Sequence, residues 1–190
     1  MQRRAARYQG PPMTLLCQSE GSTLLVIDTQ ERLMPAIDDG DEVIRRCVQL
    51  ATAARALGVH VVGTEENPAS LGPNVAAVRT LCDTTFSKFH FSAASEPGFL
   101  ERLQQGRTLV VCGCEAHVCV MQTVVGLLEA GHPVKWVADA VGSRHAVDRA
   151  TATARARALG ADVVTTEMVI FEWLRTSQHP QFRTLLQLVR

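Results

Sequence analysis

Lysine is almost absent from this chain of 190 residues, which has two lysines against 17 arginines. Neither sign of charge is in excess, because 19 basic residues balance 19 acidic ones. A balanced chain has no net field that would attract nucleic acid or an anionic membrane. Where a lysine persists against such a bias, at Lys88 and Lys135, we look for a reason specific to lysine.

Long apolar runs are also missing. No run approaches the ~20 residues that span a bilayer. The first 13 residues lack the apolar core of a secretory signal. We therefore expect a cytoplasmic protein without a membrane or nucleic-acid partner, in which the six cysteines stay reduced.

Two kinds of binding motif are absent as well. No turn has the spacing G-x-G-x-x-G or G-x-x-x-x-G-K-[ST], so the sequence argues against dinucleotide enzymes and P-loop NTPases. No C-x-x-C pair is present, which argues against a zinc site built from paired ligands and against a thioredoxin-type disulfide. We expect no cofactor.

Residues 1–20 are predicted to form a disordered or loosely docked extension. Gly10-Pro11-Pro12 interrupts any amphipathic helix, and residues 1–12 show no apolar periodicity, so Met13 is an alternative start to Met1. Residues 21–190 are predicted to form one domain, because their number suits a single full hydrophobic core.

Apolar runs typical of buried parallel strands alternate with helical periodicity along the chain. The predicted strands are 23–28, 59–64, 108–113, 133–139 and 161–166. The predicted helices are 41–58, 97–106, 117–131, 143–160 with Ser143 as its cap, 167–176 and 180–190. Segment 84–92 fits either a strand or a loop. The alternation predicts a single doubly wound α/β domain, with helices on both faces of a mostly parallel sheet.

In such sheets, ligands bind at the carboxyl ends of the strands, where the strand order reverses. The first strand commonly adjoins the fourth, so Asp28 and Cys119 are expected to face each other. Lys88 supplies a cation that would hold Asp28 in position and tune its pKa. The alternatives are a helix cap for Asp28 and a solvated surface charge for Lys88.

Half of the cysteines lie in the stretch LVVCGCEAHVCVMQ, residues 109–122. Cys112 is interpreted as core filling within a strand, and Cys114 falls in the turn with its role open. Cys119 is expected in the first turn of a helix, where backbone N–H groups and the helix dipole lower a thiol pKa. It is either a nucleophile or a buried structural cysteine. A metal site that adds His117 is disfavoured, because a strand, a turn and a helix point these side chains apart.

Three segments resemble the signature regions of the isochorismatase-like cysteine hydrolases, a family that includes nicotinamidases and ureidoacrylate amidase. They are LLVIDTQERLMPAI, FSKFHFS and CGCEAHVCVMQTVVGLLEAGHPVKWVADAVGSR. The resemblance implies a Rossmann-like, six-stranded sheet and a catalytic triad of Asp28, Lys88 and Cys119. It also implies a cis peptide between Cys114 and Glu115, which would direct the N–H groups of Glu115 and Cys119 at one oxyanion.

The chemistry implied by the resemblance is hydrolysis of an amide-like C–N bond in a small molecule, through a thioester on Cys119. Isochorismatase itself cleaves a vinyl ether without needing a thiol nucleophile, so the presence of Cys119 favours amide-like substrates. Gln30, Glu65 and Phe91 are candidate substrate contacts. Because the family commonly oligomerises, we expect a homo-oligomer, a dimer or larger.

One departure from the family bears on metal binding. Nicotinamidases have a D-x-H metal motif after the second strand, whereas this chain has TEENPAS there. No metal is therefore expected, and Glu65 and Glu66 are expected to lie in a solvated loop. The TEENP and EMVIFEWL segments are most similar to the isochorismatase-domain-containing branch of the family.

Two other functions stay open: a non-catalytic ligand-binding member of the fold, and a thiol redox protein that uses Cys114 and Cys119. His117 is expected to pack or cap at a helix start instead of acting as a base. Phe171 and Trp173 are two positions apart and cannot share one helix face, so one of them is a candidate contact for a partner subunit.

Overall fold

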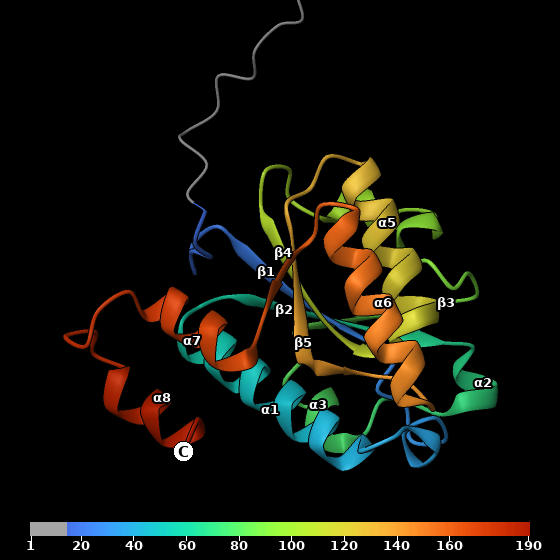
Figure 1. The fold of residues 1–190 in the computed structure, drawn as a ribbon, viewed down its shortest axis with the longest axis horizontal. Coiled ribbons are helices and arrows are strands. Elements are labelled where there is room, and N and C mark those ends of the chain that lie inside the picture. Colours follow the sequence, from blue (N-terminus) through green and yellow to red (C-terminus); the bar gives the residue numbers. More distant parts are fainter. Residues whose placement is uncertain (1–14) are drawn as a thin grey trace, which may run out of the picture.

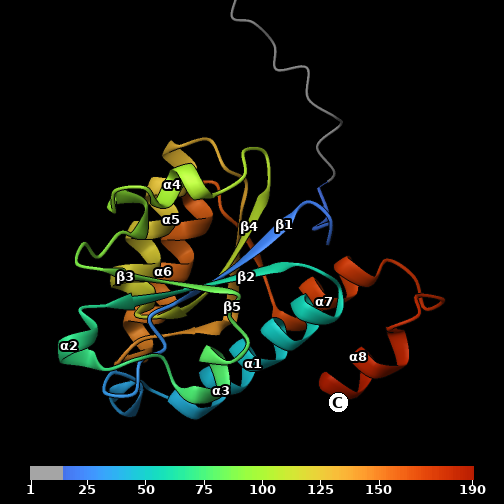
Figure 2. The ribbon, with the colours of Figure 1, turned by 180° about the vertical axis from the view of Figure 1, so that it is seen from behind.

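Six parallel strands form the centre of the structure, a computed structural model that describes residues 15–190 (Figure 1, Figure 2). The strands are β1 (Ser22–Ile27), β2 (His60–Glu66), β3 (Thr84–Lys88), β4 (Thr108–Cys114), β5 (Val134–Gly142) and β6 (Asp162–Val164). They lie in the order β3-β2-β1-β4-β5-β6. The order reverses between β1 and β4, which confirms the predicted doubly wound α/β fold.

Helices cover both faces of this sheet (Figure 1, Figure 2). One face carries α1 (Gly40–Ala56), α3 (Ala76–Arg79), α7 (Thr166–Leu174) and α8 (Phe182–Leu188). The other carries α4 (Phe99–Arg102), α5 (Met121–Glu129) and α6 (Ala146–Ala158). Shorter turns are α2 (Pro68–Leu71), η1 (Met34–Ala36), η2 (Ala93–Ser95) and the π-helical turn η3 (Ala116–Val120). Within residues 15–190, no helix combines the length and the apolar character needed to cross a bilayer.

The pleat of β1 divides the core in two. Leu24 and Val26 face the side of α1, whereas Leu25 and Ile27 face the side of α5. All six residues of β1 are buried. Burying an aliphatic side chain of this size contributes about 1.5–3 kcal/mol, so a continuous apolar run stabilises a strand only when helices cover both of its faces.

The predicted helix 97–106 is wrong in extent, because α4 is a single turn, Phe99–Arg102. The turn begins after Gly98, at φ 79°, and ends where Leu103 becomes extended with ψ 127°. The extended backbone turns Leu103 into the core beside Phe99, where it is 7% exposed. Burial of this one leucine therefore competes with continuation of the helix.

The predicted helix 143–160 begins three residues later than expected, at Ala146. His145 precedes it in an extended conformation, with φ −130°. Ser143, the expected cap, instead shares a hydrogen bond of 3.0 Å with Nδ1 of His117. The hydroxyl therefore ties β5 to the turn η3 and does not cap α6.

Strand β2 runs further than predicted and pairs with β3, the segment that the sequence left open between strand and loop. Glu66 pairs with Lys88 in this parallel register. The expectation of a solvated loop at Glu65 and Glu66 is therefore wrong: both residues belong to β2 and are partly buried.

The packed domain includes residues that the sequence assigned to the extension 1–20. Cys17 is 1% exposed, and its backbone N–H donates to Oε2 of Glu172 at 2.6 Å. Nε1 of Trp173 donates to the Cys17 sulfur at 3.2 Å. These contacts dock the chain before β1 against α7. The expectations for residues 1–14, including the alternative start at Met13, lie outside the described residues.

Candidate active site

The ends of β1 and β4 approach closely where the strand order reverses. Gly113 has a φ of +110°, and a Cβ at this position would lie 2.0 Å from the carbonyl oxygen of Ile27. Only glycine tolerates both the backbone angle and the contact. The carboxyl ends of the two central strands are thereby held side by side, with Asp28 directly after β1 and the turn η3 directly after β4.

Asp28 is completely buried at this edge. Its Oδ1 accepts a hydrogen bond of 2.7 Å from the Thr64 hydroxyl, and its Oδ2 lies 2.7 Å from Nζ of Lys88. Its backbone has a φ of 47°, in the left-handed region. The carboxylate is thus oriented from β2 and from β3, and the structure brings together Asp28 and Lys88 as the sequence predicts.

Lys88 ends β3 and has no exposed surface. Its Nζ lies 2.8 Å from Oε2 of Glu66 and donates to the carbonyl oxygens of His90 and Phe91, each at 3.3 Å. Burial acts to lower the pKa of Lys88, but the neighbouring Asp28 and Glu66 outweigh it and raise the pKa. The residue is therefore a buried ammonium, and the alternative of a surface lysine is wrong.

Glu66 is the residue of this cluster that the sequence analysis missed. One carboxylate oxygen of Asp28, one of Glu66 and the Sγ of Cys119 all lie within 4.8 Å of one another. The available signal was its position: Glu66 is two residues past the predicted strand end, and alternation sends it to the face opposite Glu65. Because the strand was predicted to stop at residue 64, the alternation was not extended to Glu66.

Cys119 lies in the π-helical turn and is 7% exposed. Burial raises the pKa of its thiol to about 12, the Asp28 carboxylate adds to the increase, and Lys88 opposes it. The turn η3 continues directly into α5, but the expected lowering of this pKa by the helix N-terminus is wrong, because burial of the thiol outweighs it. In the resting protein, the sulfur is a thiol that interacts with Asp28.

The same burial acts on Asp28. Its pKa lies above the ordinary value of 3.8, because burial disfavours the charge more than Lys88, Thr64 and Cys119 favour it. A carboxylate of raised basicity beside a protonated thiol is suited to remove a proton when a substrate arrives.

Backbone N–H groups follow directly after β4. The peptide bond between Cys114 and Glu115 is cis. The Glu115 side chain is turned away to Arg144, whose Nε and backbone N–H donate to Oε1 at 3.0 and 3.2 Å. His117 is held by Ser143, as described above, in the packing role that the sequence predicts. Because Glu115 binds Arg144 and His117 binds Ser143, neither side chain is assigned as the proton acceptor for Cys119.

Two of the three candidate substrate contacts are occupied by protein groups. The Gln30 amide donates to the carbonyl oxygens of Glu66 and Gly72, and its oxygen accepts from the Glu66 N–H at 2.9 Å. Oε1 of Glu65 accepts from the backbone N–H of Asn74 at 2.8 Å. Gln30 therefore fixes the backbone of Glu66. Phe91 differs, because its side chain is 53% exposed near the carbonyl that Lys88 binds.

Cys114 and Cys119 belong to different halves of the core. Cys114 packs with Cys47 and Cys112 on the side of α1, whereas Cys119 packs on the side of α5. Burial raises the pKa of the Cys114 thiol well above its usual value. A disulfide between Cys114 and Cys119 would require the sheet edge to rearrange, which disfavours the redox alternative.

Comparisons with known proteins show the family of this chain. A family model for the isochorismatase domain matches residues 22–168. The chain is 34% identical over 173 residues to isochorismatase domain-containing protein 2 of Danio rerio, covering 90% of this chain and 88% of that protein.

Two solved structures share the fold. The MAR1 ribonuclease of Caenorhabditis elegans superposes with a TM-score of 0.87 at 34% identity, covering 92% of each chain. The YcaC protein of Escherichia coli superposes with a TM-score of 0.81 at 20% identity, covering 92% of this chain and 96% of that one. Its description is an octameric hydrolase of unknown specificity. From the domain match and the sequence identity, we conclude that the chain belongs to the isochorismatase-like family of α/β hydrolases.

Proposed function

We propose that this protein is a cysteine-dependent hydrolase that cleaves an amide-like C–N bond in a small molecule through a thioester intermediate. The observation that carries the proposal is the buried cluster in which Asp28 meets both Lys88 and the Cys119 thiol. A non-catalytic binding protein has no need of a buried thiol beside a base, so the cluster favours an enzyme over the ligand-binding alternative.

The first half of the reaction forms the thioester. Asp28 accepts the thiol proton, and the Cys119 sulfur attacks the carbonyl carbon of the substrate. The negative charge moves to the carbonyl oxygen, where the N–H groups of Glu115 and Cys119 stabilise it. Protonated Asp28 then gives its proton to the leaving nitrogen as the C–N bond breaks. An amine departs and an acyl group stays on the sulfur.

The second half restores the enzyme. Asp28, again a carboxylate, removes a proton from water, and the resulting hydroxide attacks the thioester carbon. The C–S bond breaks, the thiolate recovers the proton from Asp28, and the acid leaves. One water is consumed for each amide bond. Lys88 keeps its proton throughout, and its charge holds Asp28 at a fixed position between the two steps.

The proposed mechanism needs no metal. Asp28, Glu66 and Cys119 each offer one ligand atom, and these atoms lie within 4.8 Å of one another, as a metal site would require. The ammonium of Lys88, however, already binds both carboxylates at 2.7 and 2.8 Å. A divalent ion would have to displace this ammonium, and a fixed protein cation supplies the same neutralisation.

The experiment is a release assay on a panel of small amides, ureides and hydroxamates, scored for ammonia or hydroxylamine. Cys119→Ala serves as the blank, because it removes the nucleophile and leaves Asp28 and Lys88 paired. Acid quenching during turnover should trap an added acyl mass on the peptide that contains Cys119. Release of product by Cys119→Ala at the wild-type rate would refute the thioester route.

Ribonuclease activity is a second candidate, because the C. elegans neighbour is named MAR1 ribonuclease. In this chain, two carboxylates at the site oppose the approach of a phosphodiester, and Asp28 and Lys88 are fully buried. A single-stranded RNA substrate belongs in the same panel. Cleavage that persists in Cys119→Ala would indicate a contaminant or a different site.

We also propose that the protein forms homo-oligomers, as the YcaC description states for that hydrolase. Of the two aromatic residues considered on α7, Trp173 is buried and Phe171 is 36% exposed. Phe171 is therefore the candidate contact for a partner subunit. Light scattering after size exclusion gives the mass, and Phe171→Ser should reduce it if this ring lies in the interface.

A further inference from the structure

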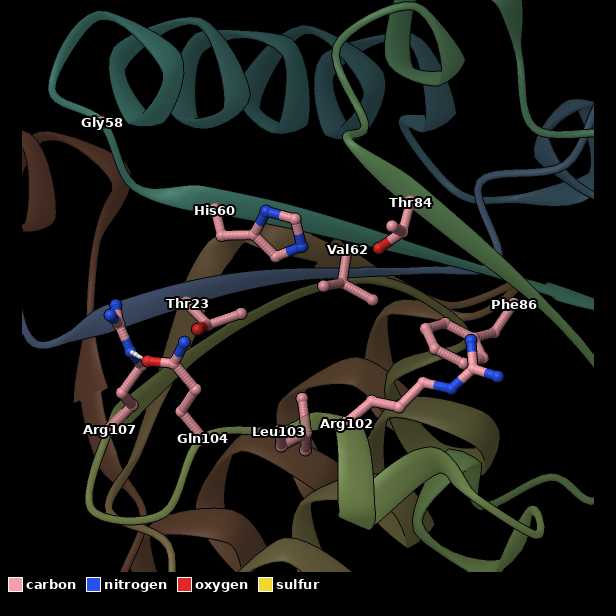
Figure 3. Close-up of a pocket in the computed structure, with 10 residues that line it drawn as sticks. All are labelled: Thr23, Gly58, His60, Val62, Thr84, Phe86, Arg102, Leu103, Gln104 and Arg107. Carbon is pink, nitrogen blue, oxygen red and sulfur yellow. Dashed lines mark hydrogen bonds between the residues drawn. The ribbon is translucent and has the colours of Figure 1, made fainter.

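A second cavity lies at the amino ends of β1, β2 and β3, away from the Asp28 cluster (Figure 3). Its volume is about 390 Å³. The lining residues are Thr23, Gly58, His60, Val62, Thr84, Phe86, Arg102, Leu103, Gln104 and Arg107. None of these described residues is acidic, and two are arginines. The cavity is therefore a positively charged pocket in a chain whose net charge is zero.

The floor of the cavity is one face of the sheet. Thr23 pairs with His60, and Val62 pairs with both Leu25 and Thr84, so the lining residues of these strands alternate with residues that face α1. Helix α4 ends at Arg102, and Arg102, Leu103, Gln104 and Arg107 form one wall of the cavity.

The two arginines on this wall keep their charge uncompensated. Arg102 lies over the Phe86 ring, with its guanidinium carbon 5.1 Å from the ring centroid. Arg107 donates from Nη1 to the carbonyl oxygen of Ser22 at 3.0 Å and from Nε to the Gln104 amide. Within residues 15–190, no acidic side chain forms an ion pair with either arginine.

Asp83, which precedes the lining residue Thr84, is already paired. Asp83 lies 3.0 Å from Nη1 of Arg55 and 3.2 Å from Nδ1 of His60, and it also accepts from the Val61 N–H at 2.8 Å. Figure 3 shows the His60 ring and the Thr84 hydroxyl directed over the cavity floor. Figure 3 shows the two guanidinium groups at opposite ends of the cavity, Arg107 near Thr23 and Arg102 over Phe86. The end that holds Arg102 is also the end lined by the apolar Phe86.

We propose that this cavity binds a small organic anion, with a carboxylate or phosphate head on Arg102 and an apolar body against Val62, Phe86 and Leu103. A guanidinium presents planar N–H donors that match these oxyanions. The volume falls in the range of ligand pockets and suits a body of about one ring. Thr84 adds a hydroxyl that orients the head.

This site is separate from the Asp28 cluster. Thr23 and Asp28 are five residues apart on one extended strand, which corresponds to ~17 Å. His60 and Glu66 are six residues apart on β2, which corresponds to ~20 Å, and Thr84 and Lys88 are four residues apart on β3, which corresponds to ~13 Å. The proposed function neither requires the second site nor depends on it.

The test is an NMR titration of the full-length, ¹⁵N-labelled protein with benzoate, phenyl phosphate and benzyl alcohol. Benzyl alcohol matches benzoate in size but is neutral. We expect at least one anion to bind with a Kd on the order of 1 mM or below, shifting the amides of Val62, Thr84 and Leu103. The anion that binds tells carboxylate from phosphate recognition. Benzyl alcohol should bind at least about tenfold more weakly, because it makes no charge-assisted hydrogen bond.

Two variants make the test specific. Arg102→Gln should weaken binding of the anion by about 10- to 100-fold, as expected for a charge-assisted contact. Arg79→Gln is the matched control, since it removes the same charge from exposed α3 on the opposite face of the sheet. Preserved amide dispersion in both spectra shows that the fold is intact.

Three results would overturn the proposal. The first is equal binding of anions by wild type and Arg102→Gln. The second is equal affinity for benzyl alcohol and the anions. The third is the absence of shifts at Thr84 with every probe, as expected if a second copy of the chain covers the cavity.

Discussion

Lys88 reaches Asp28 across an intervening strand: Nζ and Oδ2 are 2.7 Å apart, although β2 lies between β3 and β1. Neighbouring strands are about 4.8 Å apart, so the backbones of β3 and β1 are nearly 10 Å apart, and the side chains of Lys88 and Asp28 bridge this gap together. Glu66 on the middle strand binds the same ammonium. A long, unbranched side chain with a compact charge is required at this position, which explains why a lysine persists in an arginine-rich chain.

Substitutions of Lys88 should therefore show whether turnover depends on the charge of the side chain or on its shape. Lys88→Arg keeps the charge, but its planar guanidinium is broader than the ammonium it replaces. Displacement of Asp28 by about 1 Å can cost on the order of 100-fold in rate, so we expect most turnover to be lost while the fold, followed by circular dichroism, is kept. Lys88→Met should lose turnover as well, and also about 3–5 kcal/mol of unfolding free energy, because two buried carboxylates lose their partner.

The control for these variants is the other lysine. Lys135 is also buried, binds Asp162 and the carbonyl oxygen of Leu15, and lies far from Cys119 in the fold. Lys135→Arg should keep near wild-type turnover. If Lys88→Arg behaved like Lys135→Arg, the lysine-specific role would be excluded.

The rate of alkylation should depend on Asp28 at Cys119 but not at the other cysteines. Cys119 and Cys82 are the two least buried cysteines, and burial raises the pKa of Cys82 to about 11. In wild type we expect Cys119 to react fastest with limiting iodoacetamide, because Asp28 removes its proton. In Asp28→Asn, labelling of Cys119 should fall while labelling of Cys82 stays constant. Peptide mass spectrometry reads both sites in one sample, and preferential labelling of Cys17 or Cys47 would contradict the assignment.

Glu66 and Glu65 offer a matched pair of substitutions. Glu66→Gln removes one of the two carboxylates on Lys88, so the ammonium and Asp28 should shift and kcat should fall by roughly 10- to 100-fold. Glu65→Gln keeps an oxygen acceptor for Asn74 on the other face of β2 and should leave kcat nearly unchanged. Equal rates for the two variants would show that Glu66 only packs beside the site.

The pH dependence of kcat/KM should follow Asp28. The base must be ionised, and its pKa is raised above 3.8 by burial. The rate should therefore fall as pH decreases through this raised pKa, at a higher pH than an unperturbed aspartate would give. An acid limb at or below the ordinary aspartate value would contradict this assignment of the base.

The pH dependence of thermal stability is an independent test of the raised pKa of Asp28. A carboxyl whose pKa is raised in the folded state contributes its stability below the unfolded pKa, and this stability is lost as pH rises through the folded pKa. The melting temperature of Asp28→Asn relative to wild type should therefore become more positive as pH rises from the unfolded pKa through the raised folded pKa. Thermal melts of both proteins test this, and a difference that is constant with pH would show that Asp28 does not titrate there.

Removal of metal ions should leave activity intact. Lys88 binds the two carboxylates that would otherwise hold a cation, so a substrate found in the amide panel should be turned over equally after dialysis against EDTA. Activity that disappears with EDTA and returns with zinc or iron would overturn the metal-independent mechanism.

The sequence by itself determined the layers of the fold and the edge at which the site lies. Continuous apolar runs such as that of β1 are local patterns, and they report burial on both faces wherever the strand is placed. Asp28 and Cys119 stand directly after the central strands, so the reversal of strand order predicts that they meet. These inferences depend on chain order and periodicity alone.

Tertiary structure decided the rest, because it depends on contacts between distant segments. Glu66 joins the site only through the register of β2 against β3, and that register places it beside Lys88. The pKa of the Cys119 thiol is raised because surrounding elements bury it, and this burial outweighs the effect of the helix N-terminus. Helix α4 ends after one turn, and the extended Leu103 beyond it lies in the core with Phe99, a tertiary contact that the local helical pattern does not report.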